Sequence, residues 1–395
     1  MKGISTDQPV NPDDSRVIGA AVVMAVIGPI FFLLQPFYVG ALADVVGFNA
    51  QQIGWLIGAE ISGTAVASIA AFFYVRYLNW RAVVTFALLA QAICNLASCL
   101  VTGYTELLLL RFVTAVLGMG PLYIIAIAML SVTTRTGVNF SIVVFGQMTL
   151  AIAGLAILPN FVQQFGMAAL FAPIAIIGVV AFSITGFIPR QAMTRAEGRV
   201  PEIARNNARP AIGVLWVQSL WYLGIAGVWT FIERIGVEAG LASTDVNTAL
   251  AIGMAVGLAG AISSGYLTER FGRVLPFLVG MIFQCVAITL LLEGRDYYGF
   301  LAIICLYNLM WNMSIPPLFE LMALADGQNR YAVILPTAQA LALMIGAIMG
   351  GIFVHDFGLS AVLISGIVFT LLALLLFLVI AYWLDRSAKI QSAPT

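Results

Sequence analysis

The feature that most constrains this chain is a succession of about twelve apolar stretches, each long enough to cross a lipid bilayer as a helix of about 20 residues. Of the 395 residues, 62% are hydrophobic and only 9% are charged, which leaves too few polar groups to cover a water-soluble globule. The sequence therefore predicts an all-α integral membrane protein with twelve transmembrane helices. Apolar runs bounded by Gly, Pro, Asn and charged residues place these helices at 17–43, 51–73, 81–102, 106–131, 138–160, 167–188, 211–233, 244–267, 274–292, 298–322, 332–354 and 359–384.

One long polar stretch, 189–210, divides the helices into two sets of six. Two pairs of segments also align at a single shift of about 193 residues: 47–61 with 240–254, and 72–81 with 265–274. We therefore expect two pseudo-symmetric six-helix bundles joined by a linker. The predicted organisation is a cytoplasmic tail at 1–16, a bundle at 17–188, a cytoplasmic linker at 189–210, a bundle at 211–384 and a cytoplasmic tail at 385–395.

The positions of Lys and Arg predict the orientation of the chain. With a cytoplasmic amino terminus, only Arg234 and Arg295 fall in outer loops, Arg111 lies inside a span, and the other cations are cytoplasmic. Positive charge is retained on the cytoplasmic side during insertion, so both termini are expected there. The polar first sixteen residues have no signal-peptide pattern, and short loops with only two lysines are typical of a bacterial inner-membrane protein.

The stretch 265–273 reads GYLTERFGR, and we expect it to be a tight polar turn where the chain leaves the bilayer on the cytoplasmic side. It resembles the loop motif between the second and third helices of a half in the major facilitator superfamily. The resemblance covers the whole chain and implies a cytoplasmic gate that latches in the outward-open state. The residues that match this gate motif are Gly265, Glu269, Arg270, Gly272 and Arg273.

The first-half copy of this motif has lost its pattern, because Phe72 stands in place of the first glycine, Arg76 in place of the acid and Asn79 in place of the second glycine. We therefore expect the gate in the second half alone. The stretch 111–120, RFVTAVLGMG, resembles the superfamily's arginine-plus-glycine motif. The antiporter signature of the fifth helix is nearly absent, which leans away from proton-driven drug export.

Arg111 is the only cation predicted in mid-span, and charges in spans usually face a partner or a water-filled cavity. At about 1.5 Å per residue, Arg111 lies roughly 8 Å and Glu60 roughly 13 Å from the outer ends of their helices. We therefore predict an Arg111–Glu60 pair, direct or through water. One interpretation is a structural ion pair. The other is proton coupling, in which Glu60 titrates and Arg111 can also attract an anionic substrate.

The family resemblance implies that the first, fourth, seventh and tenth helices line a substrate cavity. On the tenth helix, helical spacing stacks Tyr307 over Trp311 and Asn308 over Asn312, and amides in hydrocarbon require partners. An aromatic and amide cavity suits a small amphipathic or aromatic molecule. The candidate cavity residues are Gln35, Arg111, Trp221, Tyr222, Tyr307, Asn308, Trp311 and Asn312. The seventh and first helices also offer Trp229 and Tyr38 to this cavity; the alternative interpretation places some of the aromatics in the membrane interfaces, and Tyr38, Trp229 and Tyr266 are its foremost candidates.

These observations favour a secondary active transporter that moves a small organic solute by alternating access with proton coupling, and lean towards uptake of an organic, aromatic anion. The alternatives are a proton-driven exporter of amphipathic compounds or drugs, and a non-transporting receptor or scaffold. No catalytic motif occurs, and a single histidine, His355, excludes a histidine metal site, so we expect neither an enzyme nor a metal.

We also expect no cofactor, since an ion gradient would drive transport and no nucleotide-binding loop is present. A formal net charge of zero gives no reason to expect nucleic acid. The expected partners are the substrate and the lipid bilayer, with the protein as a monomer.

Overall fold

A computed structural model describes residues 11–75, 77–191, 209–293, 296–326, 331 and 334–392, and these residues form helices and connecting turns without a strand. Eleven helices in this part of the chain are long and apolar enough to cross a membrane. The predicted all-α membrane fold is therefore confirmed. The chain divides into two compact units, Met1–Phe48 with Trp55–Arg199, and Asn49–Gly54 with Val200–Thr395.

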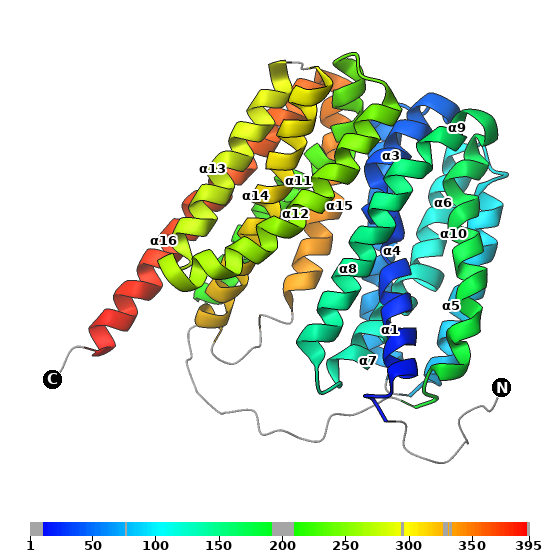
Figure 1. The fold of residues 1–395 in the computed structure, drawn as a ribbon, viewed down its shortest axis with the longest axis horizontal. Helices are drawn as coiled ribbons and strands as arrows, with labels where there is room; N and C mark the ends of the chain where they lie inside the picture. Colours follow the sequence, from blue (N-terminus) through cyan, green and yellow to red (C-terminus); the bar gives the residue numbers. More distant parts are fainter. Residues whose placement is uncertain are drawn as a thin grey trace. The chain divides into compact units, whose positions relative to one another are not determined.

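The first unit contains the helices drawn from blue to green in Figure 1, except for the first residues of α4, which fall in Asn49–Gly54 of the second unit. Their bounds are α1 (Ser15–Ile27), α2 (Ile30–Leu33), α3 (Gln35–Ala41), the π-helix η1 (Leu42–Val46), α4 (Ala50–Tyr74), α5 (Trp80–Ser98), α6 (Tyr104–Thr114), the π-helix η2 (Ala115–Met119), α7 (Gly120–Ser131), α8 (Thr136–Ile157), α9 (Pro159–Phe165), α10 (Met167–Ala181) and the 3₁₀ helix η3 (Phe182–Phe187).

The first span is broken into short helices, whereas the sequence predicted one continuous helix over 17–43. Proline explains the first break, because Pro29 has no N–H to donate to the carbonyl of Ala25. The Gln147 side chain of α8 donates to that carbonyl instead, at 2.9 Å. A neighbouring helix thus satisfies a backbone group that cannot be left unpaired in hydrocarbon.

Turns that the charge pattern assigns to one side of the membrane meet at one end of the first unit. Asp13, before α1, accepts a hydrogen bond from the backbone N–H of Thr134 at 2.9 Å. The N–H of Trp80 donates to the carbonyl of Arg190 at 3.1 Å, and the Arg81 guanidinium donates to the carbonyls of Gly186 and Ile188 at the end of η3. The chain crosses the membrane an even number of times between the two turns of each pair, so both turns lie at the same end of the unit.

The second unit contains the helices drawn from green to red in Figure 1. Their bounds are α11 (Arg209–Glu238), α12 (Ser243–Phe271), α13 (Val274–Leu290), the 3₁₀ helix η4 (Leu291–Glu293), α14 (Tyr297–Ala325), α15 (Leu335–Phe357) and α16 (Leu359–Ser392).

Helices α12 and α14 pack closely because glycines remove side chains from the face of α12. A Cβ atom at Gly253 would lie 2.6 Å from a methyl group of Ile304, and one at Gly260 would collide with the backbone of Leu309. Small residues allow this close approach between membrane helices.

The prolines of α14 are accommodated within a continuous helix, although a proline usually bends or ends one. Pro317 cannot donate to the carbonyl of Met313, but the Ser264 hydroxyl of α12 does so at 2.6 Å. The neighbouring helix again replaces the missing backbone donor.

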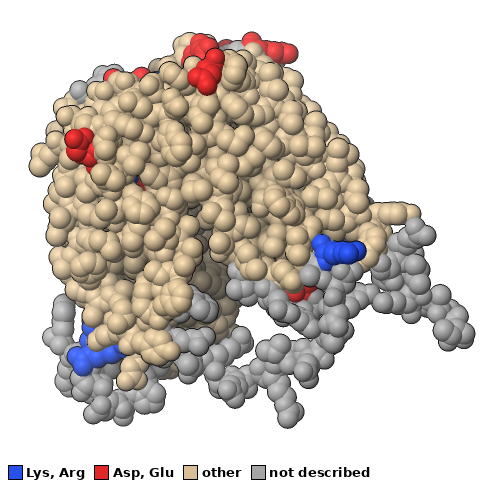
Figure 2. Space-filling model, turned by 180° about the vertical axis from the view of Figure 1, so that it is seen from behind, with Lys and Arg blue, Asp and Glu red and all other residues tan. Residues whose placement is uncertain are grey.

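Uncharged side chains cover most of the face in Figure 2, and the exposed Lys and Arg side chains lie near its lower edge. This distribution matches long apolar helices whose charged residues are concentrated near the helix ends.

Candidate functional site

A buried charge cluster lies in the first unit, where α4, α5 and α6 face one another. Arg111 of α6 is 0% exposed and Glu60 of α4 is 3% exposed. Nη2 of Arg111 is 2.7 Å from Oε1 of Glu60, and Nε is 3.3 Å from Oε2. The expected Arg111–Glu60 pair is therefore present as a direct, two-point contact.

The other guanidinium nitrogen of Arg111 has partners on α5. Nη1 donates to Oδ1 of Asn95 at 2.9 Å and to Oγ of Ser98 at 3.4 Å. Neither residue was connected with Arg111 from the sequence. Their spacing of three residues places them on one face of a helix, which is the signal that could have connected them.

Two aromatic rings enclose the Arg111 side chain. The guanidinium carbon lies 4.9 Å from the ring centroid of Phe31 and 4.9 Å from that of Phe171. A cation against an aromatic face is stabilised by the ring quadrupole, most strongly away from water. The cluster therefore offsets the cost of burying a permanent charge with one carboxylate, two neutral acceptors and two rings.

Tyr38 belongs to this cluster, although one interpretation of the sequence placed it in a membrane interface. It is 0% exposed, it stacks on Phe31 at 4.3 Å and Phe171 at 5.8 Å, and its hydroxyl donates to the carbonyl of Leu170 at 2.6 Å. That interpretation was wrong because position along a helix does not reveal which way a side chain faces. Gln35 of α3, a candidate cavity residue, is also buried.

The second unit holds an aromatic cluster centred on Trp311 of α14. The Trp311 ring makes edge contacts with Tyr307 at 5.8 Å, Tyr222 at 6.5 Å and Trp229 at 5.6 Å. Trp221 contacts the Tyr222 ring at 5.2 Å. Four of the predicted cavity residues are thus brought together, by helices α11 and α14.

Trp229 is 2% exposed in this cluster, which contradicts the interpretation that places it in a membrane interface. The helical spacing of Trp229 and Tyr222 on α11, seven residues apart, could have placed them on one face. Tyr266, the third aromatic expected in an interface, is 61% exposed.

The two amides of α14 face α12 and bond to their own helix. Asn308 donates to the carbonyl of Ile304 at 3.0 Å, and Asn312 donates to the carbonyl of Asn308 at 2.9 Å. A Cβ atom at Gly257 of α12 would lie 2.7 Å from the amide nitrogen of Asn312. The amide nitrogens therefore belong to the packing between these helices.

The stretch 265–273 is mostly helical, which corrects the prediction of a turn beginning at Gly265. Helix α12 continues to Phe271, and the turn is reduced to Gly272, at φ +75°, and Arg273. Glycine adopts this left-handed conformation without the steric cost of a Cβ atom.

The charged residues of this stretch have different surroundings. Arg270 donates to the hydroxyl of Tyr266 at 3.0 Å. Arg273 approaches Glu320 of α14 at 4.0 Å, and the exposed Glu269 has no ion-pair partner among the described residues. Arg76 of the degraded first-half copy lies outside the described residues.

Sequence reasoning missed a second buried acid, Glu233, because it ended the seventh helix there. Helix α11 continues to Glu238, and Glu233 is 0% exposed. Its carboxylate accepts from Arg234 at 2.6 and 3.1 Å and from the Ser243 hydroxyl at 2.6 Å. The apolar Ile235, Gly236 and Val237 that follow were the available signal that the helix continues.

Among the described residues, no group of three or more His, Cys, Asp or Glu side chains is placed to hold a metal ion. The geometry consists of one buried ion-pair cluster in the first unit, and an aromatic cluster and a smaller acid cluster in the second.

Comparisons with known proteins agree on one family. The family model described as Major Facilitator Superfamily matches residues 20–335. An uncharacterised MFS-type transporter of Bacillus subtilis strain 168, YbcL, is 21% identical over 370 residues, which cover 91% of this chain and 94% of that protein.

Solved structures share the fold at low sequence identity. A bacterial homologue of the human lysosomal transporter Spinster, solved inward-facing and unoccupied, is 13% identical with a TM-score of 0.68, over 95% of this chain and 98% of that one. The nucleoside transporter NupG is 10% identical with a TM-score of 0.68, over 93% of this chain and 98% of that one.

Proposed function

We propose a substrate class and a coupling ion for this chain, which belongs to the Major Facilitator Superfamily and is a secondary transporter that spans the membrane several times. The proposed activity is proton-coupled uptake of a small organic anion, with an aromatic carboxylate as the leading candidate. The proposed setting is the bacterial inner membrane, with both termini cytoplasmic and the protein acting as a monomer. An ion gradient, without a cofactor, would supply the driving force.

The observation that carries the proposal is the buried contact between Arg111 and Glu60 at 2.7 Å. An arginine side chain keeps its charge in proteins, whereas a carboxylate can be protonated. Protonation of Glu60 would cancel its negative charge and weaken its hold on the guanidinium. Donors that had bonded to Glu60 would then be available to another carboxylate.

This competition would couple a proton to an anion. Nη1 of Arg111 already donates to the neutral side chains of Asn95 and Ser98. The positive charge of the guanidinium is then balanced by one negatively charged partner. Either ionised Glu60 or a substrate carboxylate can be this negatively charged partner. Charge balance therefore favours substrate binding when Glu60 is protonated. Release of both would restore the original ion pair.

We assign the cytoplasmic gate to the end of α12 and the start of α13, with Glu269, Arg270 and Arg273 as its charged residues. The contact between Arg273 and Glu320, at 4.0 Å, supports an electrostatic connection from this turn to α14. Such surface pairs are weak individually, which suits a contact that must form and break during a cycle.

Proton-driven export of amphipathic compounds is the second candidate, and the aromatic cluster around Trp311 favours it. Aromatic rings bind apolar and aromatic parts of a molecule without requiring a carboxylate. This alternative predicts transport of neutral or cationic aromatic compounds with no dependence on a substrate carboxylate.

The test is uptake by purified protein in proteoliposomes with an imposed proton gradient. A panel of radiolabelled aromatic carboxylates and their neutral amides would be offered to wild type and to Glu60→Gln, with Glu106→Gln as the control at an exposed acid in the first turn of α6. We expect wild type and Glu106→Gln to accumulate a carboxylate when the interior is alkaline. Glu60→Gln should exchange substrate but lose gradient-driven accumulation.

Unchanged accumulation and pH dependence in Glu60→Gln would refute proton coupling through Glu60. Equal transport of a carboxylate and its amide would refute recognition of an anion. Uptake by intact cells, compared with a deletion strain, gives the direction: loss of accumulation on deletion supports import, and raised internal solute supports export.

A further inference from the structure

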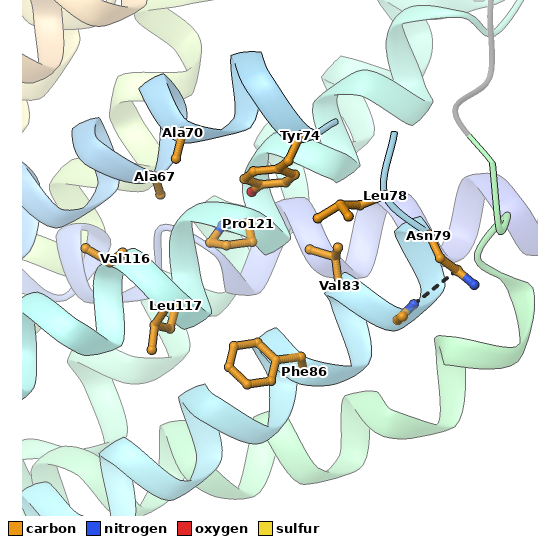
Figure 3. A pocket seen from close by; sticks show the side chains of 11 residues that line it. Ala67, Ala70, Tyr74, Leu78, Asn79, Val83, Phe86, Val116, Leu117 and Pro121 are labelled. Atoms are coloured by element: carbon orange, nitrogen blue, oxygen red, sulfur yellow. Dashed lines mark hydrogen bonds between the residues drawn. The ribbon is translucent and has the colours of Figure 1, made fainter. Parts of the chain in front are cut away.

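A groove of about 470 Å³ opens on the first unit between α4, α5 and the junction of η2 with α7. Figure 3 shows alanines of α4 on one side, Phe86 of α5 on another, and Val116 and Leu117 of η2 between them. Phe86 and Leu117 are exposed, so the groove is continuous with the outer surface of this unit.

The sequence explains why this space is unfilled. Helix α4 presents Ala67 and Ala70 to the groove, and an alanine side chain is only a methyl group. Opposite them, the π-helix η2 widens the helix just before Pro121. π-helical turns of this kind are rare and frequently occur at functional sites.

Hydrocarbon is the medium that this groove faces. Most of its walls belong to Ala50–Ala71, Trp80–Ser98 and Tyr104–Ser131, each long and apolar enough to cross a membrane, and its remaining lining residues, Tyr74, Leu78 and Asn79, lie just beyond these spans. In a bilayer, an apolar recess of this kind is filled by lipid chains.

One polar group marks where a polar part of the occupant would lie. The hydroxyl of Tyr74 is buried and has no hydrogen-bond partner among the described residues, and its ring borders the groove in Figure 3. A hydrocarbon chain alone would leave this donor unsatisfied, whereas an ester carbonyl could accept from it. Tyr74 is the last residue of α4, and tyrosines at helix ends commonly lie at the level of lipid headgroups.

The remaining polar residues at this end of the groove are consistent with a phospholipid. Asn79 already accepts from the N–H of Ala82 at 3.2 Å, drawn as a dashed line in Figure 3, so it caps α5. Arg81 follows two residues later and does not line the groove; its guanidinium donates to the carbonyls of Gly186 and Ile188 and places a positive charge at the same end of α5. A phosphate group nearby would be attracted to that charge.

We propose that this groove binds one acyl chain of a diacyl phospholipid from the cytoplasmic leaflet, with the Tyr74 hydroxyl donating to an ester carbonyl of that lipid. The assignment of the leaflet follows from the predicted cytoplasmic position of the α4–α5 turn. The site is separate from the Arg111 cluster and does not depend on which solute is transported.

The test is retention of lipid by purified protein, measured by native mass spectrometry after release from nanodiscs of palmitoyl-oleoyl phosphatidylethanolamine. Ala70→Phe would fill the groove from an exposed position of α4, and Ala153→Phe makes the same change at an exposed position of α8 outside it. We expect wild type and Ala153→Phe to retain one lipid, and Ala70→Phe to lose at least nine-tenths of that retention, about tenfold.

A second variant tests the polar contact without changing the shape of the groove. Tyr74→Phe removes one hydroxyl and should lower retention of the diacyl lipid about fivefold, the effect of one hydrogen bond. It should not alter retention of the diether analogue, which lacks the carbonyl. Equal retention by Ala70→Phe and wild type would overturn the site, and equal losses of both lipids in Tyr74→Phe would overturn the ester contact.

Discussion

Replacing Glu60 with leucine should destabilise the first unit strongly, because it strands a charge that cannot be removed. Arg111 is 0% exposed, and its guanidinium cannot be deprotonated in a protein. Glu60→Leu removes the carboxylate that makes contacts of 2.7 and 3.3 Å with it. The charge would remain buried with Asn95, Ser98 and two aromatic rings as its only partners in the described cluster.

The size of the effect follows from these remaining contacts. Removing one partner of a buried ion pair costs about 3–5 kcal/mol. Because two neutral acceptors and two rings still face the guanidinium, we expect the lower end, about 3 kcal/mol. Glu60→Gln also removes the negative charge, but it keeps a carbonyl acceptor in place of Oε1 and should cost less than Glu60→Leu, about 2 kcal/mol.

A double variant separates the stranded charge from the general cost of changing this site. Glu60→Leu with Arg111→Met removes both charges, so it should recover about 2 kcal/mol relative to Glu60→Leu alone. The free energy of unfolding can be measured by titrating SDS into detergent micelles containing each variant. If the double variant loses the sum of the two single losses, the ion pair carries no coupling energy and the reasoning is refuted.

Two further predictions concern the packing of α12 against α14. Gly260→Ala should cost about 1–3 kcal/mol because its Cβ would collide with the Leu309 backbone, whereas Gly265→Ala, with nothing within 4 Å of its Cβ, should be neutral or slightly stabilising in the same SDS titration. Equal effects would contradict the packing argument. Ser264→Ala should cost about 1–3 kcal/mol by leaving the Met313 carbonyl unpaired, and an unchanged unfolding midpoint would show that the carbonyl finds another donor.

The sequence alone was sufficient for features that depend on position along each helix. Span length and the bilayer thickness predicted the helices, and the distribution of Arg and Lys predicted which turns share a side. In the first unit, Asp13, Thr134 and Trp80 do lie in turns that meet at one end. The Arg111–Glu60 contact was predictable in the same way, because both residues had to be at similar depth.

Features that depend on rotation about a helix axis required the tertiary structure. The same depth in the membrane is compatible with a side chain facing lipid or facing a neighbouring helix. The interpretation that places Tyr38 and Trp229 in interfaces was therefore wrong, and the amides of Asn308 and Asn312 proved to face the glycines of α12.

Helix length and breaks were also decided by neighbours. Local sequence favours ending a helix at charged residues or prolines, yet α11 continues past Glu233 because Arg234 and Ser243 satisfy its carboxylate. Pro317 lies within α14 because Ser264 of α12 satisfies the carbonyl that it leaves free.

The sequence determined which segments enter the membrane and how deep each residue lies, whereas contacts between helices determined which polar groups are paired. The physical reason is that a buried polar group in hydrocarbon must find its partner on whichever helix packs beside it.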